Sequence, residues 1–133
     1  MYQFYGWETA SPFVRKLYDD LLQCWCAETC APRMRGDWST ENPTLGQCSI
    51  TSFLVQDIMG GKVYGIPLPE GGYHCYNVAD GMLFDLTSEQ FGDTVLDYTD
   101  NPEQLRETHF ADPDKRERYE LLKARLAAVR GDK

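Results

Sequence analysis

The sequence lacks a hydrophobic run long enough to cross a membrane. No apolar stretch approaches the ~18 residues that a bilayer-spanning helix requires. The first residues, MYQFYGWETA, contain neither the basic segment nor the apolar segment of an export signal. We therefore predict a cytoplasmic protein that does not associate with membranes.

Basic residues are also scarce. The 133 residues include 21 acidic and 13 basic side chains, which gives a net charge of -8. On average, such a surface repels the phosphates of nucleic acids and of anionic lipids. We therefore exclude nucleic acid as a partner and expect a small-molecule or peptide substrate. The composition predicts no particular oligomeric state.

The cysteines lack the pattern of a disulfide framework or of a metal site. They are five in number, at Cys24, Cys26, Cys30, Cys48 and Cys75. An odd number of cysteines without an export signal favours free thiols. Cys24 and Cys26 lie on opposite sides of a predicted helix, and no second CxxC pair or histidine pair accompanies them, so we predict no metal. No phosphate-binding loop is present, and we expect no cofactor.

The spacing of apolar residues predicts an α+β fold in a single domain, residues 1–133. Apolar residues make up 42% of the chain, enough for one hydrophobic core. Caps and helical spacing predict helices after Ser11-Pro12, from residue 44 or 45 to 59, after Asn101-Pro102 and after Asp112-Pro113, with a loop at 31–42. Alternation predicts antiparallel strands at 62–68, 73–78 and 82–87, and residues 88–98 are a candidate fourth strand.

Cys48 lies at the start of the second predicted helix, in the stretch NPTLGQCSITSFLVQDIMGG. The first turn of a helix favours the thiolate form of cysteine, which is a far better nucleophile than the thiol. Gly46 would let a substrate carbonyl approach the backbone, and the Cys48 N–H would contribute to an oxyanion hole, with the amide of Gln47 or another side chain as the second donor. The alternative is that Cys48 is a small buried apolar residue.

The chain contains only two histidines that could serve as the base, His74 and His109. His74 lies near the start of a predicted strand, which is rigid enough to hold an imidazole against the cysteine. His109 falls between two acidic helical segments. We therefore choose His74, with a purely structural hydrogen bond to the core as the alternative role.

Asp85 and Asn77 are the candidates for the residue that orients the histidine. If Asp80-Gly81 forms a two-residue hairpin, Asp85 is the diagonal neighbour on the histidine's face of the sheet. Strand alternation places Asn77 on the opposite face. We therefore predict a hydrogen bond between His74 and Asp85. A structural role for Asp85 in the following turn is the alternative.

A wider set of residues accompanies this arrangement. It comprises Trp25, Thr29, Trp38, Pro43, Gly46-Gln47-Cys48, Gly60-Gly61, His74, Tyr76, Asn77, Gly81, Asp85-Leu86-Thr87 and Gln90-Phe91. In these positions the chain resembles the YunG family of small, mostly uncharacterised bacterial proteins, although Cys75 stands where an aromatic residue is expected. The resemblance implies a papain-like cysteine-peptidase core, in which a central cysteine-bearing helix packs on a small antiparallel sheet, with a C-terminal helix.

Two functional hypotheses follow from the residues and the resemblance. The first is a cofactor-free cysteine hydrolase or acyl transferase that acts on an amide or thioester, with Cys48 as nucleophile, His74 as base and Asp85 as orienting residue. The candidate oxyanion or substrate-binding residues are Gln47, Gly46, Asn77 and Trp38. The second hypothesis is a non-catalytic binding or regulatory module on the same scaffold.

Overall fold

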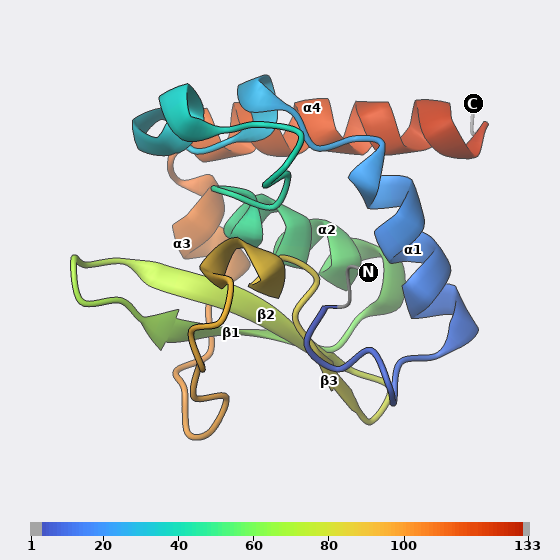
Figure 1. Cartoon of the computed structure of the whole chain (residues 1–133), viewed down its shortest axis with the longest axis vertical. Coiled ribbons are helices and arrows are strands. Elements are labelled where there is room, and N and C mark those ends of the chain that lie inside the picture. Colours follow the sequence, from blue (N-terminus) through green and yellow to red (C-terminus); the bar gives the residue numbers. More distant parts are fainter. Residues whose placement is uncertain (1–3, 132–133) are drawn as a thin grey trace.

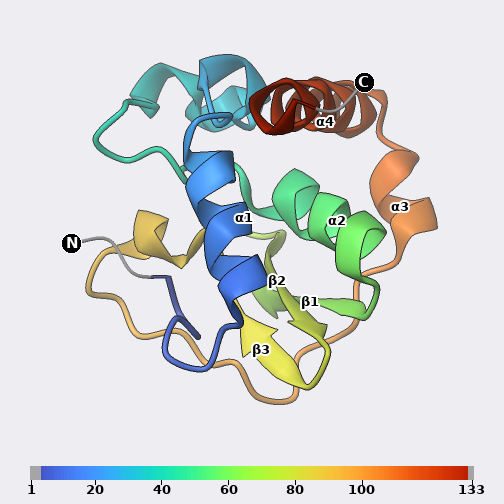
Figure 2. The ribbon, with the colours of Figure 1, turned by 90° about the vertical axis from the view of Figure 1, so that its right-hand side faces the viewer.

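Helices cover one face of a small antiparallel sheet (Figures 1 and 2). The structure is a computed structural model that describes residues 4–131. The α-helices are α1 (Pro12–Leu22), α2 (Cys48–Met59), α3 (Arg106–Phe110) and α4 (Pro113–Arg130). The strands are β1 (Lys62–Pro67), β2 (Tyr73–Ala79) and β3 (Met82–Phe84), and the 3-10 helices are η1 (Ala27–Thr29), η2 (Pro32–Asp37) and η3 (Ser88–Phe91). The α+β class that the sequence predicts is confirmed.

The strands within residues 4–131 form one sheet in the order β1-β2-β3. Ala79 pairs with Met82, so Asp80 and Gly81 form the predicted two-residue hairpin, and both have positive φ angles of 53° and 75°. The third strand is shorter than predicted because Asp85 forms a bridge with Tyr5 and not with β2, and the chain turns at residues 86–87. This register fixes which side chains of β2 and of the segment after β3 share a face.

The helix that carries Cys48 begins later than the sequence predicts. α2 starts at Cys48 itself, and not at residue 44 or 45. Gly46 has a φ of 70°, and its carbonyl accepts a hydrogen bond from the Ala31 N–H at 3.0 Å, so the backbone is drawn away from helical geometry. The cysteine is therefore the first residue of the helix.

Two predictions for the segment after β3 are wrong. Residues 88–91 form η3 and the remainder up to residue 98 has no regular structure, so no strand lies there. No helix starts at Asn101-Pro102 either. The Pro102 carbonyl instead accepts from Gly65 N–H, and Glu103 forms a bridge with Tyr64, because the exposed edge of β1 offers free backbone groups.

The outer helices follow their predicted caps. Ser11 caps α1 through the Val14 N–H, and Asp112 caps α4 through the N–H groups of Asp114 and Lys115. The predicted apolar stripe of α4 (Tyr119, Leu122 and Leu126) is buried, whereas Val129, expected in the same stripe, is exposed. No helix between residues 4 and 131 is long and apolar enough to span a bilayer.

One hydrophobic core holds α1, α2 and α4 against the sheet. It contains side chains from each of these elements, among them Leu17, Ile50, Ala79 and Leu122. A smaller apolar cluster of Phe53, Val63 and Cys75 lies between α2 and the sheet, and Cys48 packs against it. The core therefore fixes the position of the first turn of α2 relative to β2.

Candidate active site

Cys48 is a half-buried residue at the first position of α2. The N–H groups in the first turn of a helix have no partner within the helix, so they supply hydrogen-bond donors beside the sulfur. Gly46 is required two residues earlier, because a Cβ there would lie 2.5 Å from the Cys30 sulfur. The backbone before the cysteine is thus packed tightly against the η1–η2 region. All five cysteines are free thiols, as predicted.

His74 and Asp85 form a fully buried pair. Nε2 of His74 lies 2.6 Å from Oδ2 of Asp85, and each side chain is only 1% exposed. The other oxygen of Asp85 accepts from the Thr87 N–H at 3.2 Å, and Tyr98 donates its hydroxyl to Oδ2 at 2.7 Å. The predicted hydrogen bond is confirmed, and donors from three residues hold the carboxylate in place.

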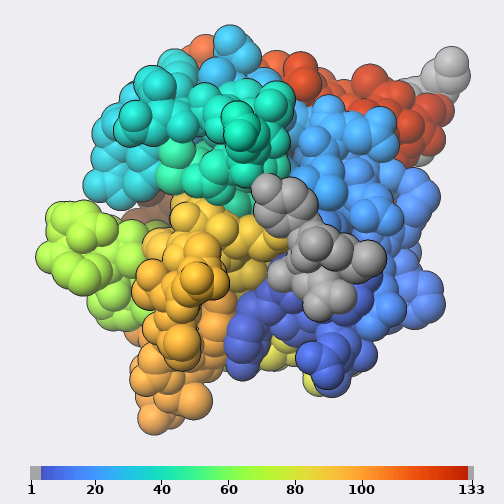
Figure 3. Space-filling view, viewed as in Figure 1, coloured from blue at the N-terminus to red at the C-terminus, as the bar shows by residue number. Residues whose placement is uncertain are grey.

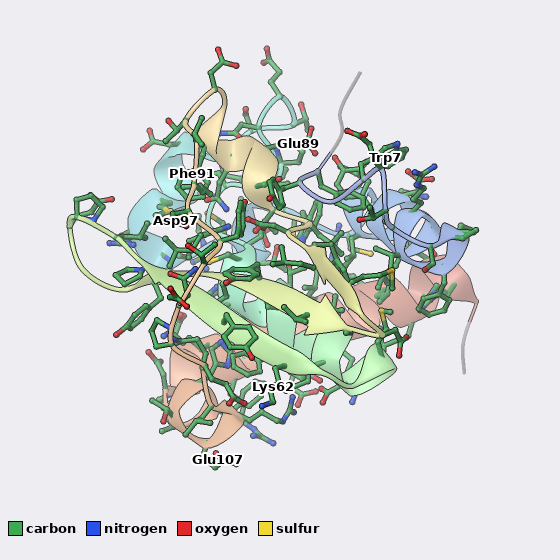
Figure 4. The ribbon with its side chains drawn as sticks, turned by 90° about the horizontal axis from the view of Figure 1, so that it is seen from below. Trp7, Lys62, Glu89, Phe91, Asp97 and Glu107 are labelled. Atoms are coloured by element: carbon green, nitrogen blue, oxygen red, sulfur yellow. The ribbon has the colours of Figure 1, made fainter. Side chains whose placement is uncertain are left out.

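A segment without regular structure covers this pair on the face of the sheet opposite α2. Figure 4 shows the stretch that carries Asp97 crossing the strands. It delivers Tyr98 to Asp85, and its backbone carbonyl at Tyr98 accepts from the Tyr76 hydroxyl at 3.2 Å. The Phe91 ring of η3 lies edge-on to the His74 ring, with centroids 4.6 Å apart. These contacts exclude water from the His74–Asp85 hydrogen bond.

Asn77 lies on the other face of β2. Its side chain is buried, and Nδ2 donates to the Ser52 carbonyl of α2 at 2.9 Å. This placement follows the strand parity that the sequence predicts. Asn77 therefore joins β2 to α2, and it makes no contact with the histidine ring.

The pKa values of Cys48 and His74 are shifted in opposite directions. Hydrogen bonding from the Cys75 thiol is the largest influence, and together with the neighbouring His74 it holds the pKa of Cys48 well below its ordinary value, against the effect of burial. Burial lowers the pKa of His74, but the Asp85 carboxylate and Cys48 outweigh it and raise the pKa to about 10. The Nδ1 atom of His74 is buried, with no hydrogen-bond partner of standard geometry among the described residues. Both pKa shifts act in the direction of a thiolate and an imidazolium.

Cys48 and His74 line a cavity of about 690 Å³. Its walls come from η2, the start of α2, the β1–β2 turn, η3, α3 and the start of α4. Figure 3 shows the surface hollowed between the β1–β2 turn, the η2 segment and η3. The volume suits a small molecule or a short peptide segment.

The remaining candidates divide into residues inside and outside the cavity. Gly46 lines it, and its N–H donates to the Gln90 side chain at 3.2 Å. The Gln47 side chain is fully buried and donates to the Cys26 carbonyl at 3.1 Å. Trp38 donates to the Pro43 carbonyl at 3.0 Å. Neither Gln47 nor Trp38 is among the residues that line the cavity, so both side chains support the loop before α2.

His109, which the sequence reasoning set aside, also lines the cavity. Its side chain is 6% exposed, its Nε2 lies 3.1 Å from the Ser49 hydroxyl, and its ring packs on Phe53 with centroids 4.6 Å apart. Burial, followed by the charges of Lys115 and Arg118, lowers the pKa of His109 to about 4. Two features of the sequence could have pointed to His109 as a site residue. It is one of only two histidines in the chain, and the polar Ser49, its partner, directly follows Cys48.

The fold and the site define an α+β protein with a cysteine, a histidine and an aspartate gathered where a buried helix meets an antiparallel sheet. The model of the YunG protein family matches residues 14–131, so the chain belongs to the YunG family. It is similar to the protein of Bacillus subtilis (strain 168) named "Uncharacterized protein YunG", with 36% identity over 86 residues. That match covers 65% of this chain and 71% of the relative. No solved structure matches the chain significantly.

Proposed function

We propose that the protein is a cysteine-dependent hydrolase or acyl transferase that acts on an amide or a thioester. The observation that carries the proposal is the buried 2.6 Å hydrogen bond between Asp85 and His74 beside Cys48. Cys48 is the first residue of α2, and it lines the cavity. A residue that only filled the core would need neither a lowered pKa nor access to a cavity. Perturbed titratable groups gathered in a cavity are typical of catalytic sites.

The first half of the proposed reaction forms an acyl-enzyme. The Cys48 thiolate attacks the carbonyl carbon of the substrate, and the carbonyl electron pair moves to oxygen. Donors in the first turn of α2, with the Cys48 N–H foremost, stabilise this oxyanion. The tetrahedral intermediate then expels the amine or thiol, which takes the proton from Nδ1 of the His74 imidazolium. The products of this half are the free leaving group and a thioester on Cys48.

The second half returns the enzyme to its starting state. Neutral His74 accepts a proton at Nδ1 from an attacking water or amine, and the new tetrahedral intermediate expels the Cys48 thiolate. The thiolate and imidazolium are thereby restored together. The task of Asp85 is to fix the tautomer and orientation of the ring.

The order of the site residues along the chain also bears on the class of fold. We infer a papain-like arrangement from the order cysteine helix, histidine strand and aspartate after the next strand, which matches the resemblance of the motifs. The packing of α2 on β2 through Asn77 and Cys75 supports this order in space. The competing function, a binding or regulatory module without chemistry, predicts an inert Cys48.

Limiting alkylation separates the two functions. We expect iodoacetamide at substoichiometric concentration to modify Cys48 before the other four cysteines at pH 7, as measured by peptide mass spectrometry. Cys24 provides the internal reference, since it is fully buried and burial raises its pKa to about 11. Labelling of several thiols at one rate, or of Cys48 only after unfolding, would reject the catalytic function in favour of the binding module.

A further inference from the structure

The charge of the cavity differs from the charge of the whole chain. The charged side chains that line it are Arg33, Lys115, Arg118 and Glu70, three basic and one acidic. The whole chain carries a net charge of -8. An average charge therefore misrepresents the field that a bound molecule meets.

Lys115 is the unpaired cation that α4 contributes to this cavity. It is half-buried in the first turn of α4, and its ammonium forms neither an ion pair nor a hydrogen bond with any residue in the range 4–131. A positive side chain in the first turn of a helix opposes the helix dipole, so this placement does not serve the stability of α4. The charge is therefore available to a ligand.

Arg118 lies one turn further along α4 and is fixed. Its side chain is 6% exposed, its Nε donates to the Asp114 carboxylate at 2.8 Å and its Nη1 donates to the Thr29 carbonyl at 3.1 Å. Asp114 is 46% exposed, so water screens its charge. Arg118 therefore keeps the wall positive without moving to meet a ligand.

His109 lines the same cavity beside α4. Its Nδ1 is buried and has no hydrogen-bond partner among the residues that the structure describes. When the Ser49 hydroxyl donates to Nε2, the proton of the neutral ring sits on Nδ1. His109 therefore stays neutral beside Lys115, whose charge contributes to the lowering of its pKa, and it leaves that cation without a competing charge.

We infer that the substrate carries a carboxylate, which Lys115 holds at the wall of the cavity formed by α4 while Cys48 attacks the amide or thioester carbonyl. This inference rests on the proposed function and names its substrate class. One unpaired ammonium suits a singly charged group. The Asp112 side chain already occupies the N–H groups of Asp114 and Lys115, so the start of α4 offers few backbone donors to a phosphate.

Two alkylating agents with the same reactive carbon test the inference. Iodoacetate carries a carboxylate and iodoacetamide a neutral amide, so the ratio of their rates at Cys48 reports preference for the anion. We expect Lys115→Gln to lower the iodoacetate rate about three- to five-fold, the effect of losing one nearby unit charge, and to leave the iodoacetamide rate unchanged. Lys115→Arg should keep the wild-type ratio.

The matched control is Lys123→Gln. Lys123 is an exposed lysine on the same helix and does not line the cavity, so its removal changes the net charge equally. The ratio of the two rates should stay at the wild-type value. An equal change in both lysine variants would assign the effect to the general field of the protein and overturn the inference.

Glutarate provides the second readout, since its length separates the carboxylate from the reacting centre. It should slow iodoacetamide labelling of Cys48 in a saturable way in the wild type and much less in Lys115→Gln, while glutaramide protects neither protein. Loss of the charge effect in both readouts, with fast and selective labelling of Cys48 retained, would overturn the substrate class alone. Slow, unselective labelling of Cys48 would reject the proposed function itself.

Discussion

The two histidines of this chain border one cavity, and their neighbours shift the pKa values of the two rings in opposite directions. His74 is paired with the Asp85 carboxylate, which raises its pKa to about 10 against the effect of burial. His109 is buried beside Ser49, Lys115 and Arg118, and burial and these two cations lower its pKa to about 4. The neighbours of each ring therefore determine its chemical role. The His74 ring is suited to move protons, and the His109 ring is suited to remain a neutral donor or acceptor.

Replacing the two histidines one at a time should change the labelling rate of Cys48 by very different amounts. His74→Ala should slow iodoacetamide labelling of Cys48 at pH 7 by about ten-fold or more, since each unit of rise in the cysteine pKa costs ten-fold in thiolate. His109→Ala should change that rate less than two-fold, because a neutral ring does not stabilise a thiolate. Labelling rates from peptide mass spectrometry measure both. Equal losses would remove the distinction between the two rings.

The residues that orient His74 should also behave differently from each other. Asp85→Asn should keep the fold but slow Cys48 labelling several-fold, because an amide stabilises an imidazolium less than a carboxylate. Asn77→Ala should leave labelling nearly unchanged and lower the free energy of unfolding by about 1–3 kcal/mol, since it leaves the buried Ser52 carbonyl without its donor. Urea denaturation measures the second effect. The reverse pattern would make Asn77 the orienting residue.

Cys75 offers a smaller and sharper test of the thiolate. Its hydrogen bond is the largest influence that lowers the pKa of Cys48. Cys75→Ala should therefore slow labelling of Cys48 a few-fold at pH 6, while Cys75→Ser, which keeps a donor, should label at nearly the wild-type rate. The ratio of the two variants is the measurement. Identical rates would mean that His74 alone stabilises the thiolate.

His109 should reveal itself through the pH dependence of stability. In the folded protein its pKa is lowered to about 4 by burial and then by Lys115 and Arg118, whereas the unfolded chain has a value near 6.5. The unfolded chain therefore binds this proton first, so stability falls as pH drops from 6.5 towards 4. The loss is about 3 kcal/mol for a shift of this size. His109→Gln should lack this part of the acid loss in denaturation experiments, and a wild-type slope in that variant would contradict the buried neutral ring.

Local chemistry explains what the sequence could predict. Ser11 and Asp112 cap their helices through their own side chains, and Asp80-Gly81 fixes the hairpin by its positive φ angles. The hairpin register then brings Asp85 to His74 through strand parity, although they are eleven residues apart. These predictions needed only neighbouring residues and one turn.

Contacts between distant segments account for the rest. His109 meets Ser49 across 60 residues, and Tyr98 reaches Asp85 from a segment that the sequence pattern suggested as a strand. Neither contact has a periodic signature, because each depends on how irregular chain packs on a finished sheet. The sequence also could not predict the position of Lys115 at the cavity, since net charge says nothing about where a cation lies.

Measuring the protonation states of the two histidine rings is the most direct test of the proposed thiolate–imidazolium pair of Cys48 and His74. With only two histidines in the chain, ¹⁵N labelling of histidine gives two sets of ring signals, which His109→Gln assigns. We predict that at pH 7.5 the His74 ring carries protons on both nitrogens, while the His109 ring carries one proton. We also predict that His74 loses a proton only near pH 10. A neutral His74 at pH 7.5, with the same spectrum in Cys48→Ser, would contradict the thiolate–imidazolium pair.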